Sequence, residues 1–172
     1  MKKLMQILKA RNLKSNRGFT LIEILVVIGI IAVLAAIVII AINPARQFAQ
    51  ARDTQRQSNV DTILNAIGQK LADSKGVFAG GTPACPALTA TTLYEIGTGA
   101  VPTAPATAMI DLSCLTPTYI PSVIPTDPVG GSAANTGYDV VVDALGRYTI
   151  SAPKATAETA LGATPPSIVV TR

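Results

Sequence analysis

The hydrophobic pattern of this chain changes at about residue 42. Residues 19–42 form a run of 24 residues that is almost entirely apolar and whose only charge is Glu23. At about 1.5 Å per residue a helix of this length reaches roughly 36 Å, enough to span the hydrocarbon core of a bilayer. The pattern therefore predicts a membrane-spanning helix with one carboxylate near its start.

The segment after residue 42 has the spacing of an amphipathic helix. Its apolar residues recur every three or four positions, and they are Ala45, Phe48, Ala51, Val60, Ile63, Leu64, Ile67 and Leu71. Gly76 suits the end of this helix. Pro44 lacks an N–H and is expected to bend or loosen the helix at the junction. We expect one long helix over residues 19–74, apolar in its first half and amphipathic in its second.

The remainder of the chain is rich in Gly, Pro, Thr and Ala. Residues 76–136 are predicted to be mostly loop, with a short helical turn at Thr91–Ile96. Two β-rich runs at residues 138–142 and 147–151 predict a hairpin, and residues 167–171 predict a third strand. The apolar stripe of the helix is the candidate cover for this sheet. The expected fold class is α+β, with the long N-terminal helix packed against a small C-terminal antiparallel β-sheet.

Cys85 and Cys114 are the only two cysteines, so one intramolecular pairing is available. Both lie on the exported side of the apolar run, where a disulfide is the default expectation. Their spacing fits neither a CxxC redox motif nor a zinc site. A bridge over such a loop contributes about 3 kcal/mol and ties down a segment that is otherwise a candidate disordered linker.

The charge of the chain is concentrated at its start. The formal net charge is +4, yet from Phe19 onward there are 8 basic residues against 10 acidic ones. The six basic residues before Phe19 face no acid, and they are Lys2, Lys3, Lys9, Arg11, Lys14 and Arg17. A basic flank beside an apolar span is the positive-inside signal, which places residues 1–18 in the cytoplasm. The body of the chain is close to neutral, so its charge does not indicate a nucleic-acid partner.

Glu23 is expensive in hydrocarbon unless a partner neutralises it, so it indicates a function. A secretory signal peptide has an apolar core of only about 7–15 residues, and an ordinary anchor has no use for the carboxylate. The segment Arg17-Gly18-Phe19-Thr20-Leu21-Ile22-Glu23 resembles the class III signal of type IV pilins and type II secretion pseudopilins. Those proteins combine a basic leader, Gly before the cut, Phe after it and Glu four residues further on.

The resemblance implies that prepilin peptidase cleaves between Gly18 and Phe19 and N-methylates Phe19. Removal of 18 of the 172 residues leaves 154. Glu23 of one subunit then pairs with the Phe19 amine of a neighbour and fixes the offset between subunits. Contacts of this non-closing kind generate helical filaments. Close helix approach is favoured by small residues, here Gly29, Ala32, Ala35 and Ala36.

The expected organisation is a cleaved basic leader at 1–18, a transmembrane and assembly helix at 19–42, an amphipathic half at 43–75 and a pilin-like globular region at 76–172. The expected function is that of a structural subunit of a type IV pilus-like filament. It meets membrane lipid and an inner-membrane assembly platform as a single-pass precursor, and forms a homo-oligomeric extracellular or periplasmic fibre. One alternative is a pseudopilin of a type II secretion system. Another is a secreted binding domain on a plain N-terminal anchor. The chain has no His and no nucleophile–base constellation, so we do not expect an enzyme.

Two further features extend the resemblance. Pro44 resembles the proline around which pilin helices partly melt within filaments, although a simple kink explains it equally well. In major pseudopilins an Asp-Pro loop helps to hold calcium, and here Asp127, Asp139 and Asp143 offer suitable oxygen ligands. Aspartates near turns more often serve as caps, so no cofactor is expected and calcium is kept as an alternative.

Arg46, Arg52 and Arg56 form the only basic group near the amphipathic segment's start. In a filament able to take up DNA they are candidates for contact with it. They have no interleaved aromatic residues for stacking on bases. We therefore expect them on solvated or inter-subunit helix faces, with no direct nucleic-acid binding.

Overall fold

The computed structural model describes residues 18–162 and 167–172, which divide into two compact units at Asn43–Pro44. The first unit contains helix α1, Leu21–Ala41. The helix ends where Ile42 takes an extended conformation, with φ −100° and ψ 109°. Asn43 is disfavoured in a helix because it precedes a proline. The expectation of one continuous helix over residues 19–74 is therefore wrong, and the chain forms two helices.

The second unit begins with helix α2, Pro44–Asp73. Pro44 occupies the first helical position, where the missing N–H costs nothing and the fixed φ favours the helix. Past the C-terminal end, Gly76 has a φ of +86° and its N–H donates to the Leu71 carbonyl at 2.8 Å. The positive φ at this position explains the glycine there.

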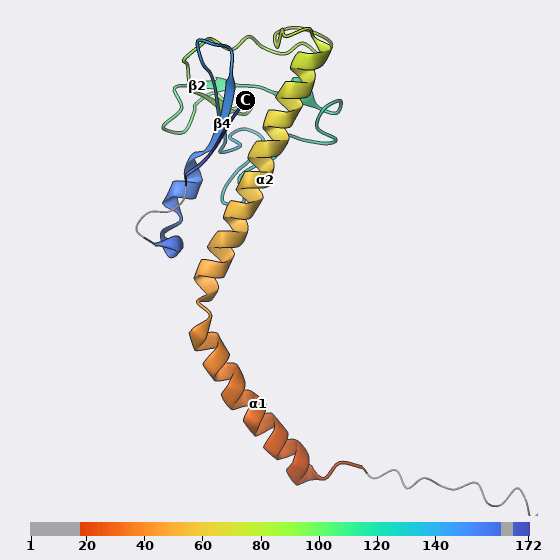
Figure 1. The fold of residues 1–172 in the computed structure, drawn as a ribbon, viewed down its shortest axis with the longest axis vertical. Helices are drawn as coiled ribbons and strands as arrows, with labels where there is room; N and C mark the ends of the chain where they lie inside the picture. The colour runs from red at the N-terminus through yellow and green to blue at the C-terminus, as the bar shows by residue number, and fades with distance from the viewer. Residues whose placement is uncertain (1–17, 163–166) are drawn as a thin grey trace, which may run out of the picture. The chain divides into compact units, whose positions relative to one another are not determined.

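A five-stranded sheet packs beside α2 (Figure 1). Its strands are β1 Tyr94–Ile96, β2 Ala108–Ile110, β3 Asp139–Val142, β4 Tyr148–Ala152 and β5 Ile168–Thr171. The order is β2-β1-β3-β4-β5, and α2 packs against β4 and β5. The long helix and small sheet of the predicted α+β fold are confirmed. The helix that packs against the sheet is α2.

The sheet is mixed, whereas the sequence predicted an antiparallel one. β1 and β2 pair in parallel, while the other neighbours pair antiparallel. The predicted hairpin and third strand are confirmed as β3, β4 and β5. The helical turn expected at Thr91–Ile96 is wrong, because Tyr94–Ile96 is β1. Among the three residues of β1, Glu95 is the one that favours helix over strand, and pairing with β3 overrides that local preference.

The segment expected to be loop contains β1, β2 and a short 3₁₀ helix, η2, at Ser113–Leu115. Cys114 of η2 is bonded to Cys85, with Cα atoms 5.2 Å apart. Both cysteines belong to the hydrophobic core. The predicted disulfide is confirmed, and it joins the segment after α2 to the sheet region.

The core lies between α2 and the sheet. From α2 it includes Val60, Ile63, Leu64 and Ile67, and from the sheet Ile96, Val140 and Ile150. The first part of the expected stripe is not in the core, because Ala45, Phe48 and Ala51 are exposed. The buried face of α2 near its start instead carries Ala49, Asp53 and Arg56. Two 3₁₀ helices, η3 Pro153–Ala157 and η4 Thr159–Leu161, follow β4.

Candidate functional site

The start of α1 is held by a capping box between Thr20 and Glu23. The Thr20 Oγ1 accepts from the Glu23 N–H at 3.2 Å, and the Glu23 Oε2 accepts from the Thr20 N–H at 3.4 Å. Each side chain satisfies a backbone donor that the first turn of a helix leaves unpaired. The carboxylate of Glu23 is thereby drawn toward the backbone beside Phe19. Its pairing with the Phe19 amine of a neighbouring chain stays a prediction, because the structure contains one chain.

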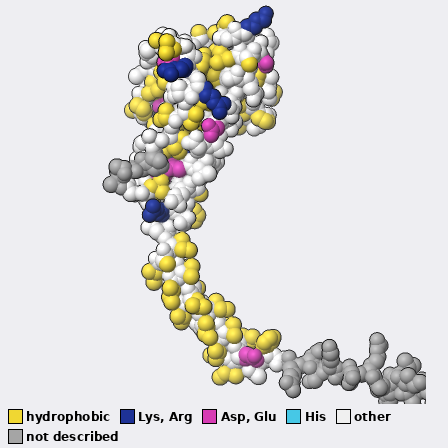
Figure 2. All heavy atoms as spheres, viewed as in Figure 1, with side chains coloured by type: hydrophobic (Ala, Val, Ile, Leu, Met, Phe, Trp, Pro, Cys, Tyr) yellow, Lys and Arg dark blue, Asp and Glu magenta, His cyan; other side chains and the backbone are white. Residues whose placement is uncertain are grey.

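The surface of α1 is apolar all round. Every residue of this helix is exposed, and Figure 2 shows hydrophobic side chains over its visible face. By length and composition α1 is the one described helix suited to cross a membrane. An apolar surface with no covering layer requires lipid or other helices around it. Glu23 is the one charged side chain of this helix.

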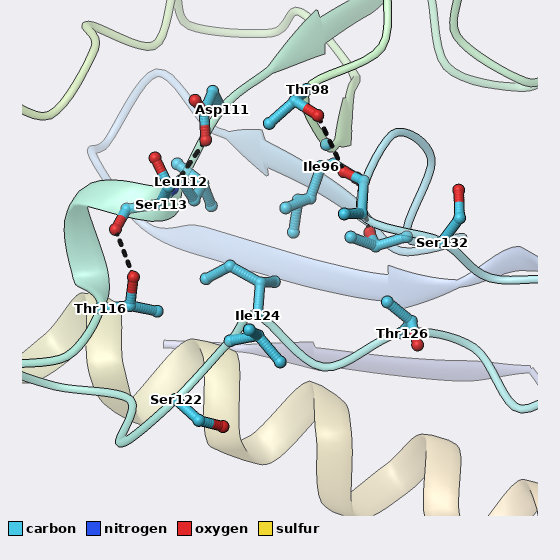
Figure 3. Close-up of a pocket in the computed structure, with 14 residues that line it drawn as sticks. Ile96, Thr98, Asp111, Leu112, Ser113, Thr116, Ser122, Ile124, Thr126 and Ser132 are labelled. Atoms are coloured by element: carbon cyan, nitrogen blue, oxygen red, sulfur yellow. Dashed lines mark hydrogen bonds between the residues drawn. The ribbon is translucent and has the colours of Figure 1, made fainter.

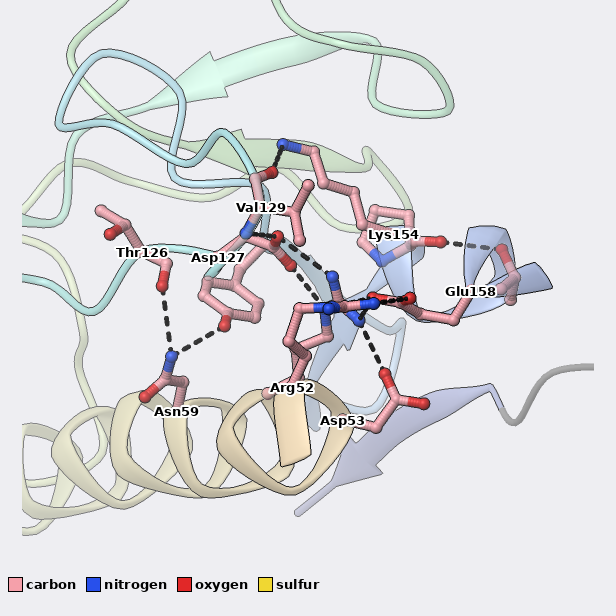
Figure 4. Close-up of polar contacts among 12 residues, drawn as sticks. Arg52, Asp53, Asn59, Thr126, Asp127, Val129, Lys154 and Glu158 are labelled. Carbon is pink, nitrogen blue, oxygen red and sulfur yellow. Dashed lines mark hydrogen bonds and ion pairs between the residues drawn. The ribbon is translucent and has the colours of Figure 1, made fainter. Parts of the chain in front are cut away.

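A buried ion cluster fastens α2 to the loops beside the sheet. The Arg56 side chain is 1% exposed. Its Nε donates to the Asp127 Oδ2 at 2.7 Å, and its Nη1 donates to both Asp53 Oδ1 and Glu158 Oε1 at 2.7 Å. Arg52 adds two bonds to Glu158, at 2.8 and 2.6 Å. Figure 4 shows Arg52, Asp53, Asp127 and Glu158 converging from α2, the 126–129 loop and the segment after β4.

The charges of this cluster are tightly coupled. Hydrogen bonds from Arg52, and then from Arg56, lower the pKa of Glu158 to about 2 against the opposing effect of burial. Burial alone lowers the pKa of Arg56, but its bonds to Asp127, Glu158 and Asp53 outweigh burial and raise the pKa. Glu158 and Arg56 are therefore both ionised at neutral pH. The cluster orients the two loops relative to α2.

Sequence reasoning placed Arg56 on a solvated or inter-subunit face, and the structure corrects this. Ala49, Asp53, Arg56, Val60, Ile63 and Ile67 are all buried. They follow one another at spacings of four, three, four, three and four, which is the spacing of a single helix face. The charged residues thus continue the apolar face of α2. That continuity was the available signal for a buried ion pair, although the partners Asp127 and Glu158 are remote in sequence.

The three aspartates considered for calcium lie in different surroundings. Asp127 binds Arg56, and the Asp143 Oδ2 accepts from the Arg147 Nε at 2.6 Å in the β3–β4 turn. Asp139 lies opposite Glu95 across β1 and β3. Over residues 18–162 and 167–172, no three acidic, His or Cys side chains are grouped as metal ligands. Calcium binding by these three aspartates stays a prediction, without a common site in the structure.

A cavity of about 360 Å³ lies between the end of β1, η2 and the 122–136 loops (Figure 3). Ile96, Leu112 and Ile124 contribute apolar surface to it, while Thr98 and Ser132 add hydroxyl groups. Its dimensions and apolar lining suit a small ligand, but its polar groups do not select a chemical class.

The family model described as the prokaryotic N-terminal methylation motif matches residues 13–42. This is the prepilin-type cleavage and methylation motif of type IV pilins and pseudopilins, as the resemblance indicated. The match includes the Gly18–Phe19 junction, Glu23 and all of α1, and residues 43–172 lie outside it. No curated protein and no solved structure matches the chain. The motif supports a type IV pilin-like or pseudopilin protein, and it is consistent with a single-pass inner-membrane precursor.

Proposed function

We propose that this chain is a structural subunit of a type IV pilus-like filament. It is inserted in the inner membrane, cut by prepilin peptidase between Gly18 and Phe19, and assembled from there through α1. The observation that carries the proposal is the methylation motif placed on an uncovered apolar helix with one carboxylate in its first turn. The role is structural and not enzymatic.

The free-energy cost of an unpaired Glu23 carboxylate in the bilayer favours assembly. In the described structure the Glu23 carboxylate accepts one hydrogen bond, a 3.4 Å bond from Thr20. That single bond leaves an ionised group costly in a bilayer. Cleavage after Gly18 creates a cationic amine on Phe19, at the end of the chain to which the capping box draws Glu23. When helices bundle, the amine of one subunit neutralises the carboxylate of the next, so assembly removes a penalty that the isolated precursor carries.

Packing of α1 supplies the remainder of the affinity. Its exposed Ile, Leu and Val side chains become buried against equivalent helices, and Gly29 has open space around its Cα for close approach. Because one helix meets its neighbour through different surfaces, the contact repeats without closing and produces a fibre. The α2–sheet unit then forms the solvent-facing part of each subunit.

A pseudopilin of a type II secretion system is the second candidate, since its class shares the same N-terminal motif. The two candidates use the same processing and the same α1 packing. They differ in the product, which is a long surface fibre for a pilus and a short periplasmic fibre for a pseudopilus. Electron microscopy of cells producing the chain with its own assembly components distinguishes them by fibre length and location.

Two substitutions test the proposal. Gly18→Leu should leave the chain at precursor length, while Thr20→Ser, which keeps a capping hydroxyl, should be cleaved normally. Glu23→Gln should be cleaved to a Phe19 N-terminus but should not form filaments, while Ile30→Val in the same helix should assemble. Mass spectrometry of the N-terminus and filament yield are the measurements. Normal filament yield from Glu23→Gln contradicts the assembly mechanism, and unchanged processing of Gly18→Leu contradicts the cleavage assignment.

A further inference from the structure

Two carboxylates face each other inside the second unit, on neighbouring strands. Glu95 of β1 is the direct cross-strand partner of Asp139 of β3. Each residue is only 2% exposed. Like charges placed directly opposite each other in a sheet destabilise it, and burial increases that cost.

Groups of the protein satisfy only part of the hydrogen-bonding capacity of these two carboxylates. The Glu95 Oε2 accepts from the Thr103 N–H and from the Asn135 Nδ2, the latter at 3.1 Å. The Asp139 Oδ2 is fully buried and has no hydrogen-bond partner. Among residues 18–162 and 167–172, no Lys or Arg forms an ion pair with either carboxylate. Within the described part of the chain, the two carboxyl groups therefore share a buried position without an ion pair to Lys or Arg.

Both carboxylates line the same cavity, which has a volume of about 200 Å³. Thr103, Ala104 and Lys154 also line it. The Lys154 Nζ donates to the Val129 carbonyl at 3.0 Å. A water molecule takes about 30 Å³ of liquid volume, so the cavity has room for a cation together with several waters.

The pKa of Asp139 agrees with the lack of a cationic partner for this carboxyl group among the described residues. Burial, and then the negative charge of Glu95, raise the pKa of Asp139 to about 7. A divalent cation coordinated by both carboxylates would favour the ionised form of Asp139 and so oppose both effects. Carboxylates, carbonyl oxygens and water are the ligands of hard divalent cations, and calcium tolerates irregular sets of six to eight such oxygens.

We propose that the cavity between β1 and β3 binds a calcium-class divalent cation through the carboxylates of Glu95 and Asp139, with waters completing the coordination. The site differs from the set of aspartates considered from the sequence. Asp127 and Asp143 do not line this cavity, and arginine side chains bind both of them. Glu95 takes their place because the sheet brings β1 beside β3.

The test uses the full chain in detergent micelles after removal of metal by a chelator. Isothermal titration with CaCl₂ should show one site, with a Kd on the order of 10⁻⁴–10⁻³ M as in extracellular calcium modules. Tyr94 and Tyr138 each adjoin one of the two ligands in sequence, so bound Tb³⁺ should luminesce on tyrosine excitation. Excess CaCl₂ should displace it.

Glu95→Gln and Asp139→Asn keep the shape of each side chain and remove its charge. Each should weaken calcium binding by at least about tenfold and abolish the Tb³⁺ signal. Asp143→Asn, which changes an aspartate outside the cavity, should bind as the wild type does. In chelator, Asp139→Asn should also have a higher thermal midpoint than the wild type, because the like-charge contact is gone.

The result that overturns the proposal is a wild-type chain that shows neither titratable binding nor a higher thermal midpoint in millimolar CaCl₂. Unchanged calcium affinity in Glu95→Gln and Asp139→Asn also overturns it. If one variant does not fold, the wild-type titration and the other variant still decide. Binding is measured on the unassembled chain, so the outcome is independent of whether the chain forms filaments.

Discussion

Replacement of Arg56 by alanine is expected to cause a large loss of stability in the second unit. The Arg56 side chain is 1% exposed and binds three carboxylates, those of Asp53, Asp127 and Glu158. Without it, Glu158 keeps Arg52 and Asp127 keeps the Val129 N–H, whereas no described hydrogen bond to the Asp53 carboxylate remains. Breaking a buried ion pair by removal of one partner costs about 3–5 kcal/mol, because the other charge stays buried. We expect Arg56→Ala to fall in that range.

The exposed pair Arg147–Asp143 provides the matched control. Its side chains are 60% and 33% exposed, and pairs in such positions contribute about 0–1 kcal/mol. Arg147→Ala should therefore change the free energy of unfolding by no more than about 1 kcal/mol. Arg56→Lys should lie between the two alanine variants, since it keeps the charge but loses the two-nitrogen contact with Asp127.

Urea unfolding of the full chain in detergent, followed by tyrosine fluorescence, measures these differences. The chain has no Trp and four Tyr. Tyr138 is buried, and its hydroxyl accepts a hydrogen bond from Asn59 at 2.8 Å. Asn59 lies about one turn after Arg56 on α2. If Arg56→Ala lowers the free energy of unfolding by no more than Arg147→Ala does, the ion cluster does not hold α2 to the loops beside the sheet.

Two other predictions concern the same unit. Cys114→Ser removes the bridge to Cys85 and should lower the free energy of unfolding by about 3 kcal/mol, and a thermal or urea midpoint unchanged from the oxidised wild type would contradict this. Hydrogen bonds from Arg52 lower the pKa of Glu158 from 4.5 to about 2, so the folded state binds this proton more weakly than the unfolded state. The stabilisation is complete above about pH 4.5 and is lost as the pH falls toward 2. Glu158→Gln should make that acid-induced loss less steep, as measured by thermal midpoints at successive pH values.

Local patterns in the sequence predicted the features that depend on neighbouring residues. The apolar run gives α1, and the two β-rich runs on either side of Gly146 give the β3–β4 hairpin. The break before Pro44 differs from the expected kink because Pro44 begins a helix and does not lie inside one.

Features that depend on remote partners were not predictable from local patterns. Tyr94–Ile96 is a strand because β3 lies beside it, about 45 residues later in the chain. Arg56 meets Asp127 across a sequence separation of 71 residues. Glu95 and Asp139 are likewise adjacent only through the sheet. The N-terminal motif could be identified from the sequence because its residues are consecutive in the chain and do not depend on remote partners.

The central claim is that Glu23 of one subunit pairs with the Phe19 amine of another. No Lys or Arg lies between Arg17 and Arg46, so trypsin leaves residues 19–46 of the processed chain as one peptide. A carbodiimide joins a carboxylate to an amine only when the two are in contact. A bond between subunits doubles this peptide, whereas a bond within one subunit leaves it single with the loss of one water.

Carbodiimide treatment of purified filaments, followed by trypsin and mass spectrometry, therefore tests the claim directly. The predicted product is the doubled 19–46 peptide, with its bond between the Phe19 nitrogen and the Glu23 carboxyl group, and filaments dissolved in detergent before treatment should not give it. Filaments that yield only the single peptide, whether unlinked or linked internally, would contradict the pairing between subunits.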